Sequence, residues 1–259
     1  MKKTMRLMTI IGVSIFCQLV SVGTPWVPQP YPQLEPFANK PRSPIAVPDG
    51  CDKLLSRGCK VTSSNPEEPL IGELSYITDG VKEIDFSTFV EVGYWRQWVQ
   101  IDLGYECEIH AVCIWHDQLS AHRDVICQIS NDPEFIDGVV TVFNNDYDNS
   151  AKLGVGKDME FISTAWGRPF AVDAVKGRYV RCYSNGSVRS NSTGNGNSVT
   201  AVNRYTEIEV FGRPLKATQK VEDSKTSPMS EANTKLYDSL PEPPQGKVWL
   251  KIEYPRWSF

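Results

Sequence analysis

The sequence has few of the residues and motifs that mark enzymes, nucleic-acid-binding proteins and membrane proteins. Three histidines occur in 259 residues, and the sequence has no Gly-x-Ser-x-Gly elbow, His-Glu-x-x-His motif or phosphate-binding glycine loop. The 27 Lys and Arg residues are outnumbered by 31 Asp and Glu residues, so neither nucleic acid nor an anionic membrane surface is an expected partner. These absences argue against an enzyme. A sandwich-fold polysaccharide lyase or glycosidase is a less favoured alternative, because such an enzyme can act through Tyr, His and Arg without a short motif.

Long apolar runs are also scarce, and the one that stands out is N-terminal. Basic residues in the first six positions precede an uncharged, mostly apolar stretch at 7–20, and small residues follow at 21–23. This order is typical of a secretory signal peptide, and the stretch is shorter than the ~20 apolar residues of a membrane-spanning helix. We therefore expect residues 1–23 to be a cleaved signal peptide, with an uncleaved anchor as the alternative. The protein is then extracytoplasmic, whether secreted, periplasmic or on the cell surface, with no membrane span after signal removal.

The cysteines permit disulfide bonds without specifying them. Beyond Cys17 in the expected signal peptide, six remain: Cys51, Cys59, Cys107, Cys113, Cys127 and Cys182. An even number in an exported chain allows several pairings that sequence alone does not rank. Cys51 with Cys59 is the local pair that we expect. For Cys113, Cys127 and Cys182, burial as small apolar side chains within strands is an equally good interpretation.

Both ends of the chain are poor in core-forming sequence. Residues 24–50 carry a proline every few positions, which favours extended conformations and predicts a stiff linker. Residues 215–259 form a tail that is polar and without a period up to residue 246, and we expect it to be disordered there. From residue 247 apolar and polar residues alternate as in a short strand. We expect this aromatic segment to pack back on the domain or to contact a partner, with an unstructured end as the alternative.

The middle of the chain, residues 51–214, has the pattern of one all-β domain. Apolar residues recur at every second position, as at Val99, Ile101 and Leu103, and turn-rich segments separate the strand-like runs. No convincing amphipathic helix interrupts them. Many short strands without helices predict an antiparallel sandwich or jelly roll.

Six segments of this middle region carry a family resemblance. In order and spacing, "LLSRGCKVTSS", "YITDGVKE", "QWVQIDLGYECEIHAVCIWHD", "VICQISNDPEF", "GRYVRCYSNGS" and "YTEIEVFG" resemble the F5/8 type C (discoidin) domain of the galactose-binding-like superfamily. The resemblance covers roughly residues 52–213. It implies an eight-stranded antiparallel jelly-roll sandwich used as a recognition module. In bacterial members of that family the module often binds sugars and often holds a structural calcium ion.

The resemblance also implies where calcium would bind. Asp79 precedes Gly80 in an Asp-Gly turn, and Glu207 stands at the position of the glutamate that opens the last strand in similar members. Calcium takes about six to eight oxygen ligands, so other groups must contribute. The predicted metal ligands are Asp79, Asp85, Thr88 or the adjacent Ser87, the Thr206 carbonyl and Glu207. The stretch between the Asp-Gly and Ser-Thr pairs is longer than the family pattern. In the alternative, Asp79 is an ordinary turn residue and Glu207 an exposed strand residue.

Ligand contacts are expected in loops at one end of the sandwich, as in sugar-binding relatives. The segments "HDQLSAHRD" and "GYWRQW" match those loops and offer Tyr94, Trp95, Arg96, His116, Asp117, His122 and Arg123. Arg and His donate to hydroxyl groups, Asp accepts from them, and an exposed aromatic ring presents an apolar plane. Trp98 is expected in the core, and Trp115 is a core candidate. A glycan or glycoconjugate is the predicted ligand, with a protein partner as the alternative.

Two further polar features have plainer interpretations. The loop "NNDYDNSAKLGVGKD" contains Asp146, Asp148 and Asp158, which can ligate a cation, but it lacks EF-hand spacing and predicts a solvated connection with Asx turns. The three histidines recur at intervals of six, yet a loop precedes the third, so a zinc trio is not expected. The sequence thus predicts an exported, non-catalytic carbohydrate-binding or surface-adhesion module braced by calcium. The alternative is a protein-interaction or structural module of the cell envelope.

Overall fold

The computed structural model describes most of the chain beyond its N-terminal segment. The described residues are 34–35, 37–65, 67, 69–83, 88–117, 120–190, 197–216 and 229–255. The expected signal peptide, the predicted metal ligand Asp85 and the neighbouring Ser87 lie outside them.

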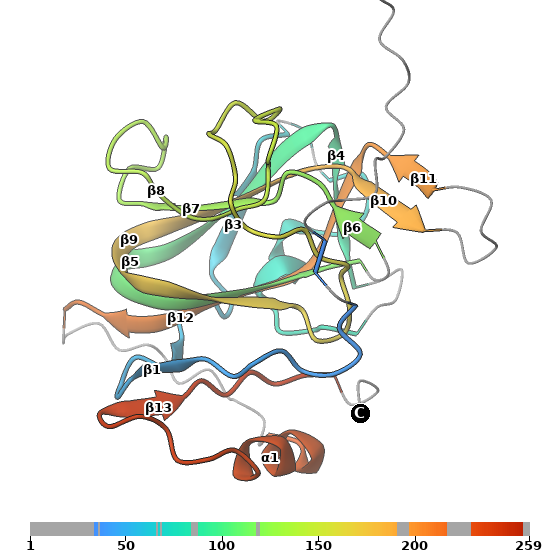
Figure 1. Ribbon diagram of the computed structural model, residues 1–259. Coiled ribbons are helices and arrows are strands. Elements are labelled where there is room, and N and C mark those ends of the chain that lie inside the picture. Colours follow the sequence, from blue (N-terminus) through green and yellow to red (C-terminus); the bar gives the residue numbers. More distant parts are fainter. Residues whose placement is uncertain are drawn as a thin grey trace, which may run out of the picture. The chain divides into compact units, whose positions relative to one another are not determined.

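Two long strands form the centre of the molecule. Strands β5 (Arg96–His116) and β9 (Arg168–Asn185) pair antiparallel, and their register shifts between Asp102 and Cys107. Figure 1 shows both strands curving back at one end. The first half of β5 also pairs with β3 (Lys60–Ser63), and its second half pairs with β12 (Val202–Pro214). Each long strand therefore serves both layers of a sandwich.

The remaining strands complete an antiparallel sheet of eight. The sheet runs in the order β2-β12-β5-β9-β7-β8, with β3 on β5 and β4 on β12. The further members are β2 (Lys53–Leu54), β4 (Val90–Tyr94), β7 (Ile126–Ser130) and β8 (Val140–Asn144). Most neighbours in this order are distant in the sequence, and such long connections are typical of a jelly roll. The predicted all-β, eight-stranded antiparallel sandwich is confirmed.

The period-two pattern explains the core of the sandwich. Val99, Ile101 and Leu103 on β5 are buried, and they pack in one cluster with Ile208 and Val210 of β12. Each fully buried aliphatic side chain contributes about 1.5–3 kcal/mol relative to an exposed one. Trp98, which was expected in the core, is instead half-buried against a separate small cluster of Ile126, Ala151 and Tyr183, with the Arg181 guanidinium 4.1 Å from its ring centroid. Trp115, in contrast, is buried on the outer face of the sheet.

Smaller elements border the sandwich. Strands β6 (Ser120–His122), β10 (Ser187–Ser190) and β11 (Asn197–Thr200) form a three-stranded sheet, and a 3-10 helix, η1 (Leu74–Thr78), precedes β4.

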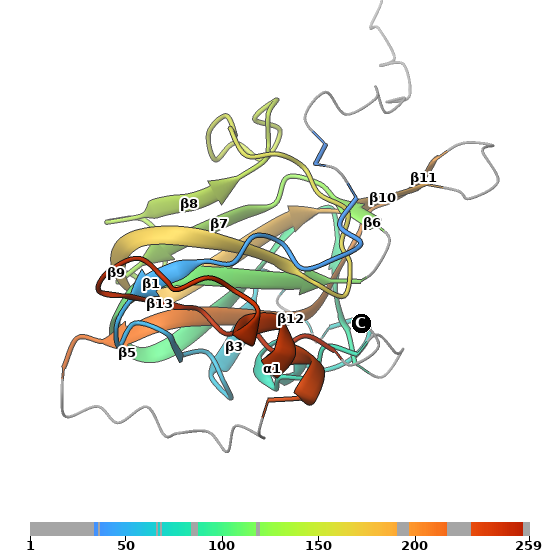
Figure 2. The same ribbon diagram turned by 60° about the horizontal axis from the view of Figure 1, so that its bottom comes forward.

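The C-terminal extension has more structure than the sequence predicts. Its helix α1 (Glu231–Asp238) starts at Ser230, whose side chain accepts a hydrogen bond from the Asn233 amide. Strand β13 (Lys247–Trp249) pairs with β1 (Ala46–Pro48), and Figure 2 shows these three elements together. The expectation of disorder up to residue 246 is therefore wrong for α1, and the expected linker ends in strand β1.

Burial explains why the extension is ordered. Leu250, Ile252 and Tyr254 are buried in a second cluster with Trp115 and Phe211 on the outer face of the sheet. The expectation that the aromatic segment packs back on the domain is confirmed for residues up to 255, while Trp257 and Phe259 lie outside the described residues.

The described cysteines are all free thiols. The expected bond between Cys51 and Cys59 is not formed, because Cys51 packs in the outer cluster while Cys59 packs against the main core. Within the ranges given above, the structure contains no helix long and apolar enough to span a membrane.

Candidate functional site

Loops that are far apart in the sequence meet at one end of the sandwich. They are the turn between β4 and β5, the segment after β6, the loop after β8 and the ends of β9 and β11; Figure 1 shows β4, β6, β10 and β11 at the same end. The fully buried Asn203 connects two of them, the turn between β4 and β5 and the end of β9. Its amide nitrogen donates to the carbonyl oxygens of Gly93 and Trp95, and its amide oxygen accepts from the Gly186 amide at 2.7 Å. The predicted convergence of the loops is observed.

Two exposed aromatic side chains lie at this end. Trp95 is 73% exposed and Tyr94 is 55% exposed. Trp95 adopts φ 62°, a left-handed conformation that is rare for a bulky residue, and its amide donates to the Ala201 carbonyl oxygen at 2.7 Å. Backbone strain of this kind persists where the surrounding structure enforces it, and it is frequent at functional sites. The fold therefore holds an indole ring in solvent instead of burying it.

Polar groups surround the aromatic pair. The exposed Arg96 donates from its guanidinium to the Ala151 carbonyl oxygen. Oδ2 of Asp124 accepts from the Asn185 side-chain amide at 2.6 Å and from the Ser150 hydroxyl at 2.9 Å. Arg123 is half-buried, and its backbone bonds to both Asn185 and Gly186. This end therefore offers an apolar plane with cationic and anionic groups beside it.

An acidic cluster adjoins these groups. Asp124, Asp146 and Asp148 place one carboxylate oxygen each within 4.8 Å of one another. Burial raises the pKa of Asp146, and the neighbouring carboxyl of Asp148 raises it further. The buried Glu160 is affected by the same charges: burial, then Asp124, raises its pKa to about 7. Asp124 and Glu160 were not predicted, because neither stands in a recognisable motif, and Asp158 instead accepts from the Asn144 amide.

The two predicted ligand-binding histidines are structural. His116 is 0% exposed and His122 is 1% exposed, and their rings stack with centroids 4.0 Å apart. Burial lowers the pKa of His116 well below its usual value. Nε2 of His122 lies 2.9 Å from Asp117 Oδ1, and Arg204 donates to Oδ2 of the same carboxylate at 3.3 Å. These pairings correct the prediction: burial removes both histidines from the surface, and Asp117 orients His122.

The predicted calcium region comes together in part. Oε2 of the fully buried Glu207 accepts from the Gly80 amide at 2.9 Å, so the Asp79–Gly80 turn does meet Glu207. Asp79 Oδ1, however, accepts from the Val81 amide, and the Thr88 hydroxyl donates to the Glu83 carbonyl oxygen. Burial raises the pKa of Asp79 and raises that of Glu207 well above its usual value.

Two cationic side chains stand among these carboxylates. Lys82 Nζ lies 2.7 Å from an oxygen of Glu209, and the Arg57 guanidinium lies 3.9 Å from Glu207 and 3.6 Å from Glu209. Neither cation was anticipated from the sequence. Calcium takes about six to eight oxygen ligands, and both cations lie beside the glutamates that would contribute some of them. With Asp85 outside the described residues, the calcium site stays a prediction.

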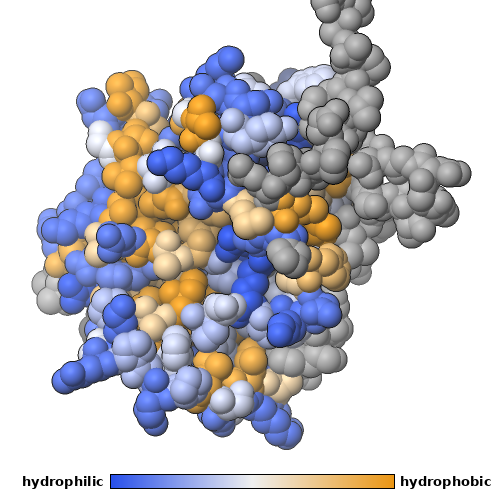
Figure 3. Space-filling view, viewed as in Figure 1, coloured by the Kyte–Doolittle hydropathy of each residue, from blue (hydrophilic) through white to orange (hydrophobic). Residues whose placement is uncertain are grey.

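A separate apolar surface lies along the side of the sheet. In the view of Figure 1, hydrophobic residues gather over the region of β7, β8 and β9 (Figure 3). A groove there is lined by Phe143, Leu153, Val155, Lys157 and Asp158, among others. It contains no predicted site residue, so the aromatic end of the sandwich is the better candidate.

Comparisons with known proteins give weak structural similarities. No family model and no curated protein matches the chain. Chitosan-binding module 1 of the chitosanase/glucanase from Paenibacillus sp. IK-5 is 17% identical, with 62% of this chain and 99% of the module covered at a TM-score of 0.41. The CBM32 module of AlyQ, in complex with 4,5-unsaturated mannuronic acid, is 18% identical, with coverage of 59% and 93% and a TM-score of 0.39.

The chain is also similar to part of a larger protein. The family 89 glycoside hydrolase from Clostridium perfringens is 18% identical, with 72% of this chain but 18% of the hydrolase covered, at a TM-score of 0.43. The chain is thus similar to modules of the CBM32 and chitosan-binding type. The similarity is weak, so the strand pairing described above, and not this comparison, establishes the fold.

Proposed function

We propose that this protein is a carbohydrate-binding module that recognises a glycan at the aromatic end of the sandwich and does not transform it. The observation that carries the proposal is Trp95, whose indole is 73% exposed on a backbone held in the left-handed region. Exposing a large apolar ring on a strained turn is unfavourable unless the ring has a ligand.

The neighbouring groups suit a sugar. A pyranose ring has an apolar C–H face and a rim of hydroxyl groups. The indole of Trp95, with Tyr94 beside it, offers a plane for the C–H face. Arg96 and the half-buried Arg123 are donors for hydroxyl groups. Because most of these groups are already held by backbone and side-chain hydrogen bonds, little ordering is needed on binding.

Burial argues against acid–base catalysis by the histidines at this end. Burial lowers the pKa of His116 well below its usual value, and neither ring nitrogen has a hydrogen-bond partner among the described residues, so this side chain is out of reach of a surface ligand. The protein-interaction alternative loses one of its two supports, because Leu250, Ile252 and Tyr254 are buried against the protein's own sheet.

Export and surface adhesion belong to the same proposal. A signal peptide at residues 1–23 would bring the module to extracellular glycans. Support for this part comes from the N-terminal sequence alone.

Affinity gel electrophoresis of the full chain on a panel of neutral, acidic and amino-sugar polysaccharides tests the proposal. We expect at least one polysaccharide to retard the protein, and Trp95→Ala to abolish the retardation. Ile136→Ala is the matched control, since Ile136 is 78% exposed on the turn between β7 and β8, away from the site. If the whole panel leaves the protein unretarded, or if Trp95→Ala is retarded as strongly as Ile136→Ala, the proposal is wrong.

A further inference from the structure

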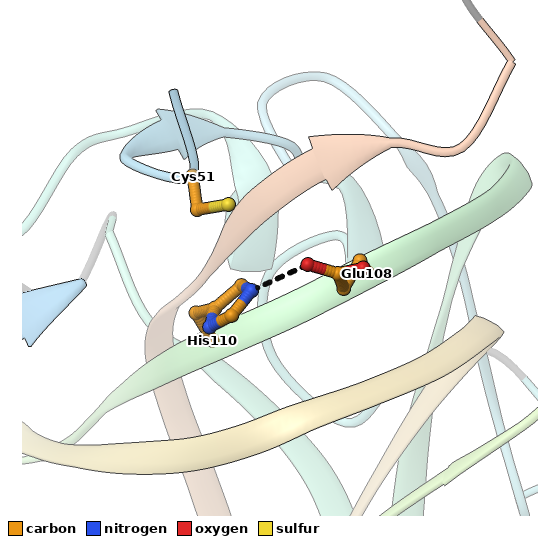
Figure 4. Close-up of side chains that lie close together, drawn as sticks. All are labelled: Cys51, Glu108 and His110. Carbon is orange, nitrogen blue, oxygen red and sulfur yellow. Dashed lines mark hydrogen bonds and ion pairs between the residues drawn. The ribbon is translucent and has the colours of Figure 1, made fainter. Parts of the chain in front are cut away.

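Three side chains with metal-ligating atoms meet on the outer face of the sheet. Cys51 Sγ, a carboxylate oxygen of Glu108 and a ring nitrogen of His110 lie within 4.8 Å of one another. Figure 4 shows the three side chains grouped around one point, with the His110 ring hydrogen-bonded to Glu108. Cys51 is 0% and His110 8% exposed, while Glu108 is half-buried. The set combines sulfur, nitrogen and oxygen donors, unlike an acidic surface cluster.

Local structure explains how the three residues come together. Glu108 and His110 are two positions apart on β5, so they share the face of the sheet that points away from the main core. Cys51 follows a tight turn after β1, in which its amide donates to the Pro48 carbonyl oxygen at 3.0 Å. Gly50 in that turn has φ 76°, a conformation that glycine adopts without strain. A rigid strand and a short turn therefore hold the donors, and little reorganisation is needed to bring them onto one ion.

The charges around the thiol favour a dication. The charged groups that act on the Cys51 thiol are the Arg213 guanidinium and the carboxylates of Glu108, Asp52 and Asp49. Negative charge therefore exceeds positive charge around the thiol. A divalent cation would gain from the carboxylates and displace the thiol proton.

We propose that Cys51, His110 and Glu108 bind a zinc-class divalent transition-metal ion, with water as a further ligand. Zinc bonds to these three atom types are about 2.0–2.3 Å long, which in a tetrahedral site places the ligand atoms about 3.3–3.6 Å apart; the three donor atoms lie within 4.8 Å of one another, so side-chain movements of up to about 1 Å bring them onto one ion. A thiolate with an imidazole selects zinc or a neighbouring transition metal over calcium or magnesium. Three protein ligands leave a coordination position open.

Arg213 would orient the carboxylate ligand. Glu108 Oε1 lies 2.9 Å from His110 Nε2, and Oε2 accepts from the Arg213 guanidinium at 3.1 Å. The same Arg213 nitrogen lies 3.0 Å from Oε1, so metal binding through Oε1 would replace that contact while Oε2 keeps its bond to Arg213, as in the outer shell of known metal sites. The Arg213 side chain is 51% exposed, so the carboxylate side of the cluster lies nearest to solvent.

Cobalt(II) titration of the full chain, reduced with a non-thiol reductant, tests the proposal directly. Tetrahedral cobalt bound to a thiolate has a strong near-ultraviolet charge-transfer band that carboxylate or imidazole ligands do not produce. We expect one equivalent of cobalt to give this band in the wild type and zinc to abolish it by displacement. Cys51→Ser should lack the band. Cys59→Ser is the matched control, because Cys59 is a half-buried thiol that bonds to the Leu55 carbonyl oxygen and lies outside the set.

Calorimetry with zinc supplies a second readout. His110→Gln and Glu108→Gln should each weaken zinc binding by at least about 100-fold, since the loss of outer-shell partners alone costs about 10–100-fold. Circular dichroism establishes that each variant is folded, and Glu108→Gln, at a half-buried position, keeps the test valid if Cys51→Ser is unstable. The proposal fails if the wild type gives no charge-transfer band, if Cys51→Ser retains it, or if both glutamine variants bind zinc as tightly as the wild type.

Discussion

Replacement of Lys82 by alanine is expected to destabilise the fold by about 3 kcal/mol. The Lys82 ammonium and the Glu209 carboxylate are 5% and 3% exposed and lie 2.7 Å apart. Lys82 also donates to the Glu253 carbonyl oxygen at 2.7 Å, and its Nζ lies 4.7 Å from the centroid of the Trp115 ring. The variant would leave the Glu209 charge buried without its main partner and would remove a bond to the C-terminal extension.

The magnitude follows from the geometry. Two unit charges 2.7 Å apart attract by about 6 kcal/mol at an effective dielectric constant of about 20, and desolvation offsets part of this. Removal of one partner of a buried pair usually costs about 3–5 kcal/mol. We take the lower limit because Arg57 remains 3.6 Å from the same Glu209 oxygen.

Urea unfolding followed by tryptophan fluorescence measures the effect as a shift of the midpoint. Lys235→Ala is the control, because Lys235 and Glu231 form an ion pair with 75% and 82% exposed side chains, and such pairs contribute little. The double variant Lys82→Ala/Glu209→Gln should be more stable than Lys82→Ala, since it also removes the stranded charge. A loss below about 1 kcal/mol for Lys82→Ala, well under the range for a broken buried pair, would refute the reasoning.

Three further predictions concern titration and the aromatic turn. Glu160 has a pKa of about 7 in the folded protein against an ordinary value of 4.5. Because the unfolded state loses this proton first, the free energy of unfolding should fall as pH rises from 4.5 to about 7. Urea unfolding across this range should show a smaller fall in Glu160→Gln, and an identical fall would contradict the assignment. Burial keeps the pKa of His116 well below 6.5. Because the unfolded state binds the proton first as pH drops below 6.5, the stability of the fold should decrease there. Thermal melting at acid pH should show a smaller decrease in His116→Phe, and a decrease equal to that of the wild type would contradict the prediction. Asn203→Ala removes hydrogen bonds to Gly93, Trp95 and Gly186, and each lost buried partner costs about 1–3 kcal/mol. The variant should have a lower melting temperature and a lower glycan affinity, although Trp95 is intact. Wild-type values for both would show that Asn203 does not hold the turn.

The strand pattern was readable because it is local. Val99, Ile101 and Leu103 alternate with polar residues, and only a sheet buries every second side chain of such a run. The order of the strand-like segments resembles that of a known family, and this resemblance correctly implied eight antiparallel strands. The Asp79–Gly80 turn meets Glu207 as the resemblance implied.

The exposure of single side chains was not readable in the same way. Trp95 is exposed as its place among the predicted ligand contacts requires, and Trp115 is buried, but Trp98, which was expected in the core, is only half-buried. His116 and His122 were expected at the surface, but His122 lies in β6, which pairs with β10, and both rings are buried. Whether a side chain is exposed depends on which distant segment covers it, and the local sequence does not specify that segment.

The sequence by itself determined the fold class, the number of strands and the loops that gather at one end, because each follows from local periodicity or from an ordered set of motifs. Only the tertiary structure decided which charges and donors became neighbours. Lys82 meets Glu209, and Cys51 meets Glu108 and His110, across separations in sequence that no local pattern encodes. The physical reason is that pairing register and the packing of the C-terminal extension are collective properties of the folded chain, set by burial of the whole core.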